Sequence, residues 1–166
     1  FSQLDPASWY VTKDGQDGLW WSERDGWAHL YRLGADGQLK NQLTSGPWYV
    51  GAIQYVDETS KQIYFTGRGR EPDRFWYYAK LYRVNYDGTG LTLLTPDDAN
   101  HVIDFSPSGK FFTDTYARIE TPPVTALRGA PDGRLIRELE KADVSRLAEV
   151  GWRPTRVFTA KGRDGI

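Results

Sequence analysis

Few residues in this chain have the types and spacing that catalysis requires. The serine nucleophile of an α/β-hydrolase lies in a G-x-S-x-G turn, and the sequence has no such motif. Ser45 and Ser108 are each followed by glycine and have the composition of ordinary turns. The two histidines, His29 and His101, lie far apart, each at the start of a strand-like apolar run. We therefore interpret both histidines as structural and expect no catalytic residue in this chain.

One acidic segment has the residue types of a cation site. Asp97, Asp98, His101 and Asp104 offer three carboxylates and one imidazole. Hard cations need ligands that converge around a sharp turn, usually with a glycine among them, and this segment has no glycine. We interpret it as a solvated turn between strands, and we expect neither a metal ion nor a cofactor.

The segment from Arg68 to Tyr78 is the best candidate for a binding role. It combines three arginines with a run of four aromatic residues, and it is longer than the corresponding loop from Glu23 to Ala28. Arginine beside aromatic side chains is the composition of a recognition surface. An aromatic run that enters a strand also serves packing, so both roles stay open. The candidate residues are Arg68, Arg70, Arg74, Trp76 and Tyr77.

These residues belong to a sequence that repeats itself at an offset of 51 positions. A third and fainter copy places Asp132-Gly133 at the position of the earlier Asp-Gly pairs. Repeats of about 40 to 50 residues with short strands and tight turns are typical of β-propeller blades. The matching segments are Leu30 to Leu33 with Leu81 to Val84, Asp36-Gly37 with Asp87-Gly88, and Leu43-Thr44 with Leu94-Thr95.

Each copy is predicted to form one four-stranded antiparallel sheet, which is the structure of a blade. The first copy predicts strands at 9–13, 18–22, 29–33 and 39–43. The second predicts strands at 49–56, 62–66, 80–86 and 91–95. The third predicts strands at 101–105, 110–115, 125–128 and 135–140.

The expected fold is therefore an all-β, partial β-propeller of about three blades within residues 1–140. The blades are expected at about 8–46, 47–97 and 98–140. Residues 141–166 do not repeat; they predict a short helix near 143–150 and a strand at 157–161.

Bulk composition excludes several classes of function. The chain has 21 basic and 22 acidic residues and a net charge of −1, so nothing predicts binding to nucleic acid. The absence of cysteine excludes disulfides and thiolate catalysis. Seven tryptophans, ten tyrosines and seven phenylalanines suit half-buried strands, while 17 glycines and nine prolines supply turns.

The segment from Trp20 to Tyr31, which reads WWSERDGWAHLY, resembles a characteristic blade segment of the dipeptidyl peptidase IV branch of the prolyl oligopeptidases. Leu81 to Val84, Asp87-Gly88 and Phe105 to Gly109 follow in that family's order. Phe158 to Lys161, followed by Asp164-Gly165, is similar to the junction between the family's propeller and its peptidase domain. The resemblance covers essentially the whole chain.

The resemblance implies a longer parent protein, a serine exopeptidase with an eight-bladed propeller and an α/β-hydrolase domain. This chain would supply the last three blades and the crossing into the hydrolase. The family's Ser, Asp and His would lie beyond Ile166, and its paired glutamates come from an earlier part of the propeller. The chain itself would therefore have no catalytic residue.

The resemblance also implies partners. The loop from Arg68 to Tyr78 would help to wall the substrate cavity of the parent enzyme, whose substrate is a peptide, or would contact another subunit. The hydrolase domain and the remaining blades would cover surfaces that this chain leaves open, and without them those blade faces could form a homo-oligomer. The parent would be periplasmic, secreted or membrane-anchored.

Two alternatives remain open. The chain could be a stand-alone propeller, or a β-sandwich with a duplicated sheet, that binds peptide or glycan without a catalytic partner. The missing initiator methionine and a final segment that stops within a pattern favour a piece of a longer protein. Dipeptidyl or tripeptidyl release and proline preference would be decided by residues outside this chain.

Overall fold

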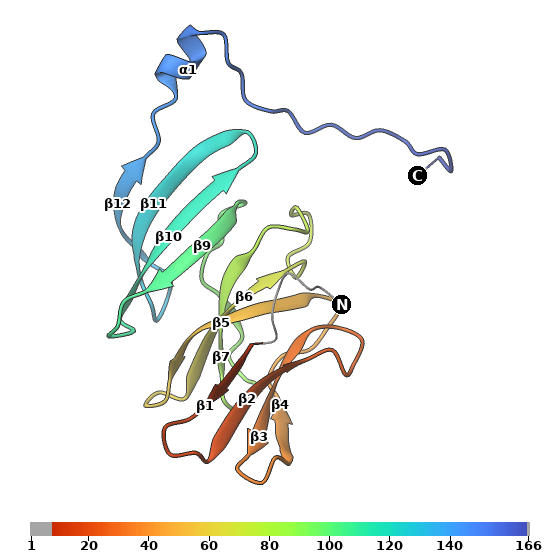
Figure 1. Ribbon diagram of the computed structural model, residues 1–166, viewed down its shortest axis with the longest axis vertical. Coiled ribbons are helices and arrows are strands. Elements are labelled where there is room, and N and C mark those ends of the chain that lie inside the picture. The colour runs from red at the N-terminus through yellow and green to blue at the C-terminus, as the bar shows by residue number, and fades with distance from the viewer. Residues whose placement is uncertain (1–7, 166) are drawn as a thin grey trace.

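Three four-stranded antiparallel sheets follow one another along the chain, as the repeat predicted (Figure 1). The computed structural model describes residues 8–165. In each sheet the four strands pair in sequence order, so every strand neighbours the next one along the chain. This meander is the topology of a propeller blade. The prediction of an all-β fold with three such sheets is confirmed.

The strands have the following bounds. Sheet 1 contains β1 (Trp9–Val11), β2 (Asp17–Ser22), β3 (His29–Gly34) and β4 (Leu39–Gln42). Sheet 2 contains β5 (Tyr49–Asp57), β6 (Gln62–Arg68), β7 (Lys80–Asn85) and β8 (Thr92–Leu93). Sheet 3 contains β9 (Asn100–Phe105), β10 (Phe111–Arg118), β11 (Thr121–Gly129) and β12 (Leu135–Lys141).

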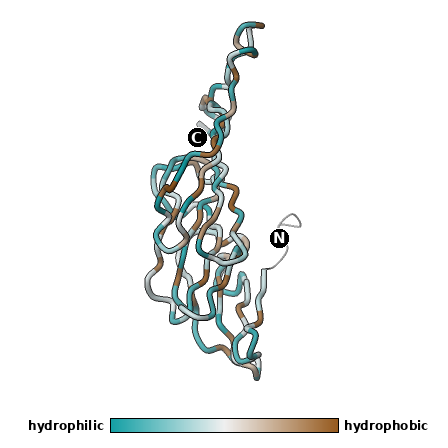
Figure 2. Tube along the Cα trace, turned by 90° about the vertical axis from the view of Figure 1, so that its left-hand side faces the viewer, coloured by the Kyte–Doolittle hydropathy of each residue, from teal (hydrophilic) through white to brown (hydrophobic). Residues whose placement is uncertain are grey.

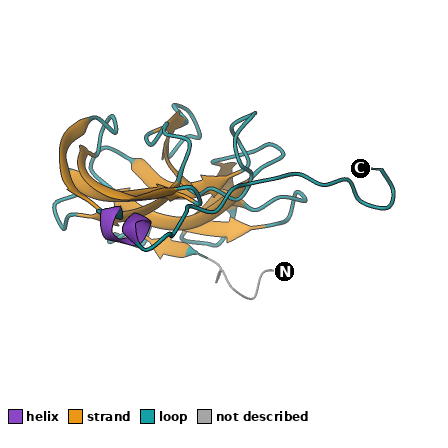
Figure 3. Cartoon of the chain, turned by 90° about the horizontal axis from the view of Figure 1, so that it is seen from above, coloured by secondary structure: helices purple, strands orange, loops and turns teal. Residues whose placement is uncertain are grey.

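The tail of the chain differs from its prediction. A short helix, α1 (Ser145–Glu149), lies within the predicted range of 143–150. The strand predicted at 157–161 does not form, and the tail runs as an extended loop away from the sheets (Figure 3). A strand needs a neighbour to receive its backbone hydrogen bonds, and no described strand pairs with this segment. Within the described residues, no helix is long and apolar enough to cross a membrane.

The repeated Asp-Gly pairs form the same turn in all three sheets. In each, the aspartate carboxylate accepts a hydrogen bond from the backbone N–H two residues later, at 2.9–3.0 Å. The glycine that follows has a positive φ, a conformation that side chains disfavour. The repeat therefore encodes one turn geometry, used at Gly37, Gly88 and Gly133.

The repeated Leu-Thr pair fastens the fourth strand to the third. The hydroxyl oxygen of Thr44 accepts a hydrogen bond from the N–H of Leu30 (3.1 Å), and Thr95 does the same for Leu81 (2.9 Å). In sheet 3 the position of Leu30 and Leu81 is occupied by Pro123. Its carbonyl accepts from the N–H of Ala142, as the carbonyls of Leu30 and Leu81 accept from Leu43 and Leu94. Because proline has no N–H, this clasp cannot form there.

Neighbouring sheets are joined at two interfaces, here called the first joint (sheets 1 and 2) and the second joint (sheets 2 and 3). At the first joint the N–H of Val50 donates to the carbonyl of Ala28 (2.9 Å). At the second, the N–H of His101 donates to the carbonyl of Ala79 (2.9 Å). Val50 and His101 are related by the repeat offset, and so are Ala28 and Ala79. The two joints therefore share one backbone geometry.

A separate buried core fills each joint, and apolar positions occur along the strands of all three sheets (Figure 2). In the first joint the rings of Trp48, Phe65 and Tyr82 pack with centroids 5.7–6.3 Å apart. The core of the second joint is smaller. Its buried members are Tyr64, Leu81, Leu94, Ile103, Phe112 and Ala130.

Candidate functional site

The predicted binding segment lies almost entirely in the loop that joins β6 to β7. Residues 69–79, here called the aromatic loop, follow Arg68, the last residue of β6. Phe75, Trp76 and Tyr77 are 54%, 45% and 72% exposed. An aromatic run of this kind on the surface is a candidate for a contact with another molecule or domain.

The start of the aromatic loop is fastened to sheet 2. Arg70 donates to Glu71 (2.8 Å), and its guanidinium lies over the ring of Tyr82, 5.6 Å from the centroid. The hydroxyl of Tyr82 donates to the same carboxylate (3.2 Å). Burial, with Glu71 adding to it, raises the pKa of Tyr82. Arg70 therefore supports the loop from beneath and is not a fully accessible binding group.

The exposed aromatic residues extend across two sheets. The ring of Trp76 lies 5.9 Å from that of Trp27, which comes from the shorter loop between β2 and β3. Trp76 also lies against Gly69, where an added Cβ would come within 2.6 Å of the indole. Together, Trp27, Phe75, Trp76 and Tyr77 form the surface that we call the aromatic shelf.

The middle of the aromatic loop is linked to sheet 3. Arg74 forms an ion pair with Asp98 (3.6 Å), and Asp98 also pairs with Arg118 at the end of β10 (2.8 Å). Arg118 in turn pairs with Glu120 in the turn before β11 (3.2 Å). The aromatic loop therefore spans the second joint as well as the first.

The candidate residues do not form one site. Trp76 and Tyr77 lie in the aromatic shelf, Arg70 supports the start of its loop, and Arg74 holds the middle of the loop. Arg68 lines a different hollow of about 330 Å³ between β5 and β9, beside Asn100 and His101. The structure therefore shows that the aromatic run is exposed and that the arginines make separate contacts, while the binding role stays a prediction.

The chain leaves sheet 3 at the same edge as the aromatic shelf. Lys141, the last residue of β12, pairs with Val124 near the start of β11. The loops that precede β3, β7 and β11 all lie at this edge, because the three sheets have the same strand order and direction. The helix α1 and the tail therefore begin on the shelf side of the molecule (Figure 1).

Both histidines are buried inside the sheets. In sheet 1 the ring of His29 contacts the hydroxyl of Thr44 (3.0 Å) and the carbonyl of Gly46 (2.9 Å). Lys80 occupies the equivalent position of sheet 2, 51 residues later, and its ammonium donates to the carbonyl of Asp97. Burial lowers the pKa of Lys80. These polar side chains bind loop carbonyls and so hold the connections between sheets.

The second joint contains a buried ionic network that the sequence did not reveal. Asp114 accepts hydrogen bonds from Nδ1 of His101 (2.8 Å) and Nε of Arg128 (2.8 Å). Arg128 also pairs with the carboxylate of Asp97 (2.7 Å). Alternation along β10 and β11 could have shown that Asp114 and Arg128 share the inward face, but not that they meet.

The acidic segment is therefore more than the solvated turn that was expected. Asp97 pairs with the buried Arg128, and Asp98 pairs with Arg74 and Arg118. The correction has a simple physical cause, because partners far apart in sequence reach these carboxylates only after folding. Within residues 8–165, no group of three or more His, Cys, Asp or Glu side chains is arranged to hold a metal ion.

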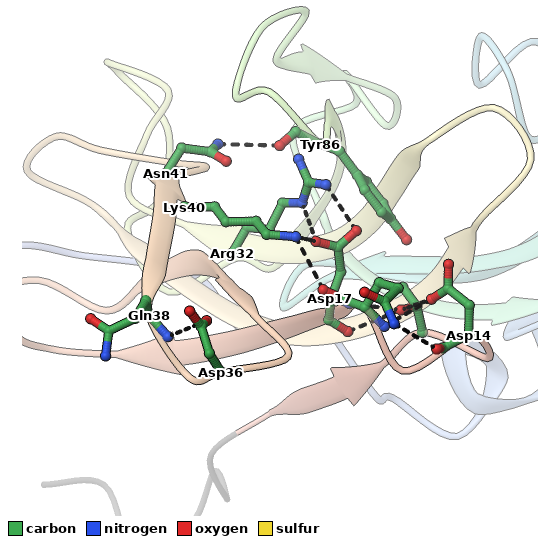
Figure 4. Close-up of polar contacts among 10 residues, drawn as sticks. Asp14, Asp17, Arg32, Asp36, Gln38, Lys40, Asn41 and Tyr86 are labelled. Atoms are coloured by element: carbon green, nitrogen blue, oxygen red, sulfur yellow. Dashed lines mark hydrogen bonds and ion pairs between the residues drawn. The ribbon is translucent and has the colours of Figure 1, made fainter.

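A second ionic cluster lies at the opposite edge of sheet 1 (Figure 4). The carboxylate of Asp17 accepts two hydrogen bonds from Arg32 (both 2.8 Å) and one from Lys40 (2.7 Å). These bonds, those from Arg32 foremost, lower the pKa of Asp17 to about 2. Asn41 extends the contact to sheet 2 by donating to the carbonyl of Tyr86 (3.2 Å). Arg32 and Lys40 share the one carboxylate of Asp17, so the cluster has a structural role.

Comparisons with known proteins agree with this architecture. The sequence is similar to dipeptidyl peptidase 4 of Arthroderma otae, with 36% identity over 104 residues, and to that of Trichophyton equinum, with 34% over 103. Each match covers 61% of this chain and 13% of the relative, so the chain spans a small part of those proteins.

Two solved structures share the fold. Porphyromonas gingivalis dipeptidyl peptidase 4 superposes with a TM-score of 0.76 at 24% identity, covering 96% of this chain and 22% of that one. A putative dipeptidyl aminopeptidase IV from Bacteroides ovatus gives 0.65 at 22% identity, covering 83% and 22%. The family described as "Dipeptidyl peptidase IV (DPP IV) N-terminal region" matches residues 1–123, which is most of the chain. This chain therefore belongs to the dipeptidyl peptidase IV N-terminal region family.

Proposed function

We propose that this chain is part of the propeller of a serine exopeptidase that releases dipeptides or tripeptides, and that its aromatic shelf helps to wall and gate the substrate cavity. The observation that carries this proposal is the common edge of the shelf and the chain exit. If residues 141–166 lead into a hydrolase domain, that domain lies on the shelf side. The exposed aromatic residues then face the space between propeller and hydrolase, where a peptide substrate is held.

The uncovered face of sheet 1 supports a place inside a larger propeller. Trp9, Trp20 and Tyr31 form one cross-strand row on this face, in which Tyr31 is covered by Arg24, and Val11 and Leu39 belong to the next row. Trp9 and Trp20 are 64% and 44% exposed. The equivalent face of sheet 2 is buried against sheet 1 in the first joint. An apolar sheet face of this kind needs a neighbouring sheet.

The turn glycines give independent support. Gly88 and Gly133 each lie against the backbone of the preceding sheet, so that an added Cβ would come within 3.0 Å of the Gln42 carbonyl oxygen and 2.1 Å of that of Leu94. Gly37 has the same conformation but nothing within 4 Å of that point. Sheet 1 therefore has the turn geometry that contacts a preceding sheet in the other two sheets, and no described residue lies against it at Gly37.

These observations support the following proposed placement. The three sheets correspond to blades at about 8–46, 47–97 and 98–140, the last three of eight, and residues 141–166 cross into the hydrolase domain. The parent acts on peptides and is periplasmic, secreted or membrane-anchored. When the other blades are missing, copies of this chain associate through the open face of sheet 1.

Peptidase kinetics of the full-length protein test the proposed role of the shelf. Trp76→Ala and Tyr77→Ala are expected to raise KM for peptide substrates or to alter the preference for substrate length, because they remove cavity wall. Phe111→Ala is the matched control, since Phe111 is similarly exposed (43%) but lies on sheet 3. Unchanged kinetics in both shelf variants, together with an unchanged oligomeric state, would show that the shelf neither walls the cavity nor contacts a subunit.

A further inference from the structure

We propose that residues 72–78 of the aromatic loop are a flap, and that Asp98 latches this flap onto sheet 3 through Arg74. The flap carries three of the four residues of the aromatic shelf, so the latch would set the position of the shelf. This inference deepens the proposed function and rests on it for its biological meaning. The latch itself is a structural claim that can be tested without any measurement of activity.

The two ends of the flap are fixed. Before it, Glu71 binds Arg70 and Tyr82, as described above. After it, the N–H of Ala79 donates to the side chain of Asn100 (2.9 Å), and the Ala79 carbonyl accepts from His101. Both anchors join the loop ends to the sheets, so any movement is confined to the residues between them.

The flap itself is held by side chains alone. Among the described residues, its only backbone hydrogen bond runs from the N–H of Tyr78 to the carbonyl of Phe75, within the flap. The other attachments are the packing of Trp76 on Trp27 and Gly69, and the ion pair between Arg74 and Asp98. A segment without ladder hydrogen bonds opens more easily than the strands beside it.

Asp98 is positioned to act as the latch because it is itself held. Its carboxylate pairs with Arg118 at 2.8 Å, and the neighbouring Asp97 is fixed by Arg128. Arg74 approaches the same carboxylate oxygen of Asp98 at 3.6 Å. Asp98, in the connection before β9, is therefore held to sheet 3, and Arg74 is the movable partner.

The ion pair between Arg74 and Asp98 is weak enough to let the flap open. Arg74 is 46% exposed at its side chain, and exposed ion pairs contribute little because water and salt screen them. Losing the pair is expected to raise the open population of the flap only about two- to five-fold, on the scale typical of such pairs. The latch therefore favours the closed shelf without locking it.

Hydrogen exchange of the full-length protein, followed by mass spectrometry of the peptide covering the flap, tests the latch. Asp98→Asn is expected to speed exchange of the Tyr78 N–H, the flap amide that is hydrogen-bonded, about two- to five-fold while leaving β6 and β7 unchanged. Arg74→Gln is expected to have the same effect, and the double variant no more than either single one. Asp104→Asn, an exposed aspartate of β9 away from the loop, is the matched control and should change nothing.

Salt provides a second and independent measurement. Raising the ionic strength should speed exchange in the flap of the native protein and should have no such effect in Asp98→Asn, because the screened pair is already absent. Unchanged flap exchange in both Asp98→Asn and Arg74→Gln would overturn the latch. Faster exchange that extends through β10 and β11 would also overturn it, since the change would then be a general loss of stability.

The latch and the proposed function fail in different ways. If flap exchange in Asp98→Asn is no faster than in the native protein, the latch is refuted even if the shelf variants alter peptide kinetics. Conversely, fast flap exchange supports the latch, while unaltered kinetics in Trp76→Ala and Tyr77→Ala refute the role of the shelf as a cavity wall.

Discussion

The first and second joints have the same backbone geometry and an apolar core each, but they differ in chemistry at three equivalent positions. The first joint places Val50, Phe65 and Val84 on its inner face, and all three are fully buried. The equivalent inner positions of the second joint hold His101, Asp114 and Arg128, as the matching strand registers show. The repeat thus fills these positions with apolar side chains in sheet 2 and with an ionic network in sheet 3, which lies beside the smaller apolar core of the second joint.

The difference shows how the same blade scaffold tolerates exchange of its core. Apolar packing has no fixed direction, whereas the ionic network requires each partner at a defined distance. Buried ion pairs often contribute little net stability compared with apolar residues of similar volume, but breaking them is costly. The second joint should therefore be the more sensitive to single substitutions.

The largest expected effect follows from removing the centre of the ionic network. Asp114→Ala leaves His101 and Arg128 without their shared carboxylate and should lower the free energy of unfolding by about 3–5 kcal/mol. Urea denaturation of this chain measures the loss. Replacing the network by the residues of the first joint, with His101→Val, Asp114→Phe and Arg128→Val combined, is the counterpart experiment. It should be far less damaging than the single change, and an equal or greater loss would show that the two joints are not interchangeable.

The turn glycines should show the next largest effect. Gly133→Ala places a Cβ within 2.1 Å of a backbone oxygen at a φ of +69°, so it should destabilise the second joint by about 2–4 kcal/mol. Gly37→Ala has a similar φ of +75° but no neighbour, and should cost only about 1–2 kcal/mol. Denaturation of the two variants under identical conditions makes the comparison. Equal losses would mean that contact with the preceding sheet adds nothing.

Low pH should weaken the ion pairs that Asp17 makes with Arg32 and Lys40 in sheet 1. Arg32 and Lys40 lower the pKa of Asp17 from 3.8 to about 2. Because the folded-state pKa is depressed, the stabilisation is present above pH 4 and disappears as the pH falls towards 2. It amounts to about 2 kcal/mol. Unfolding free energies measured across this range should decline less steeply in Asp17→Asn, and parallel curves would contradict the assignment.

The smallest expected effect concerns the open face of sheet 1, which packs on no other sheet among the described residues. The open face of sheet 1 should make this chain self-associate with rising concentration, because its exposed tryptophans occupy positions that are buried at the first joint. Trp20→Ser should weaken that association several-fold, as removal of one exposed aromatic residue from a contact does. Analytical ultracentrifugation over a concentration series measures it. A monomer at every concentration would remove the self-association proposal.

Much of the fold was readable from residue patterns. The Asp-Gly pairs and the Leu-Thr pairs each perform one local task, in a turn or a clasp, so their repetition predicted three equivalent sheets. The tail strand at 157–161 was predicted wrongly because its apolar residues indicate strand propensity, while strand formation also needs a partner. The aromatic run was located from its composition, and its exposure was shown only by the structure; its role as a binding site stays a prediction.

The sequence by itself determined the repeat, the all-β class, the turn geometry at each Asp-Gly pair and the presence of an aromatic loop rich in arginine. These features depend on contacts between residues close together in the chain. Only the tertiary structure decided that His101, Asp114 and Arg128 meet, that Asp98 holds two arginines, and that the shelf shares an edge with the chain exit. His101, Asp114 and Arg128 come from three strands of sheet 3, and Asp98 reaches Arg74 from the connection before β9. These contacts exist only once segments far apart in the sequence have paired and packed.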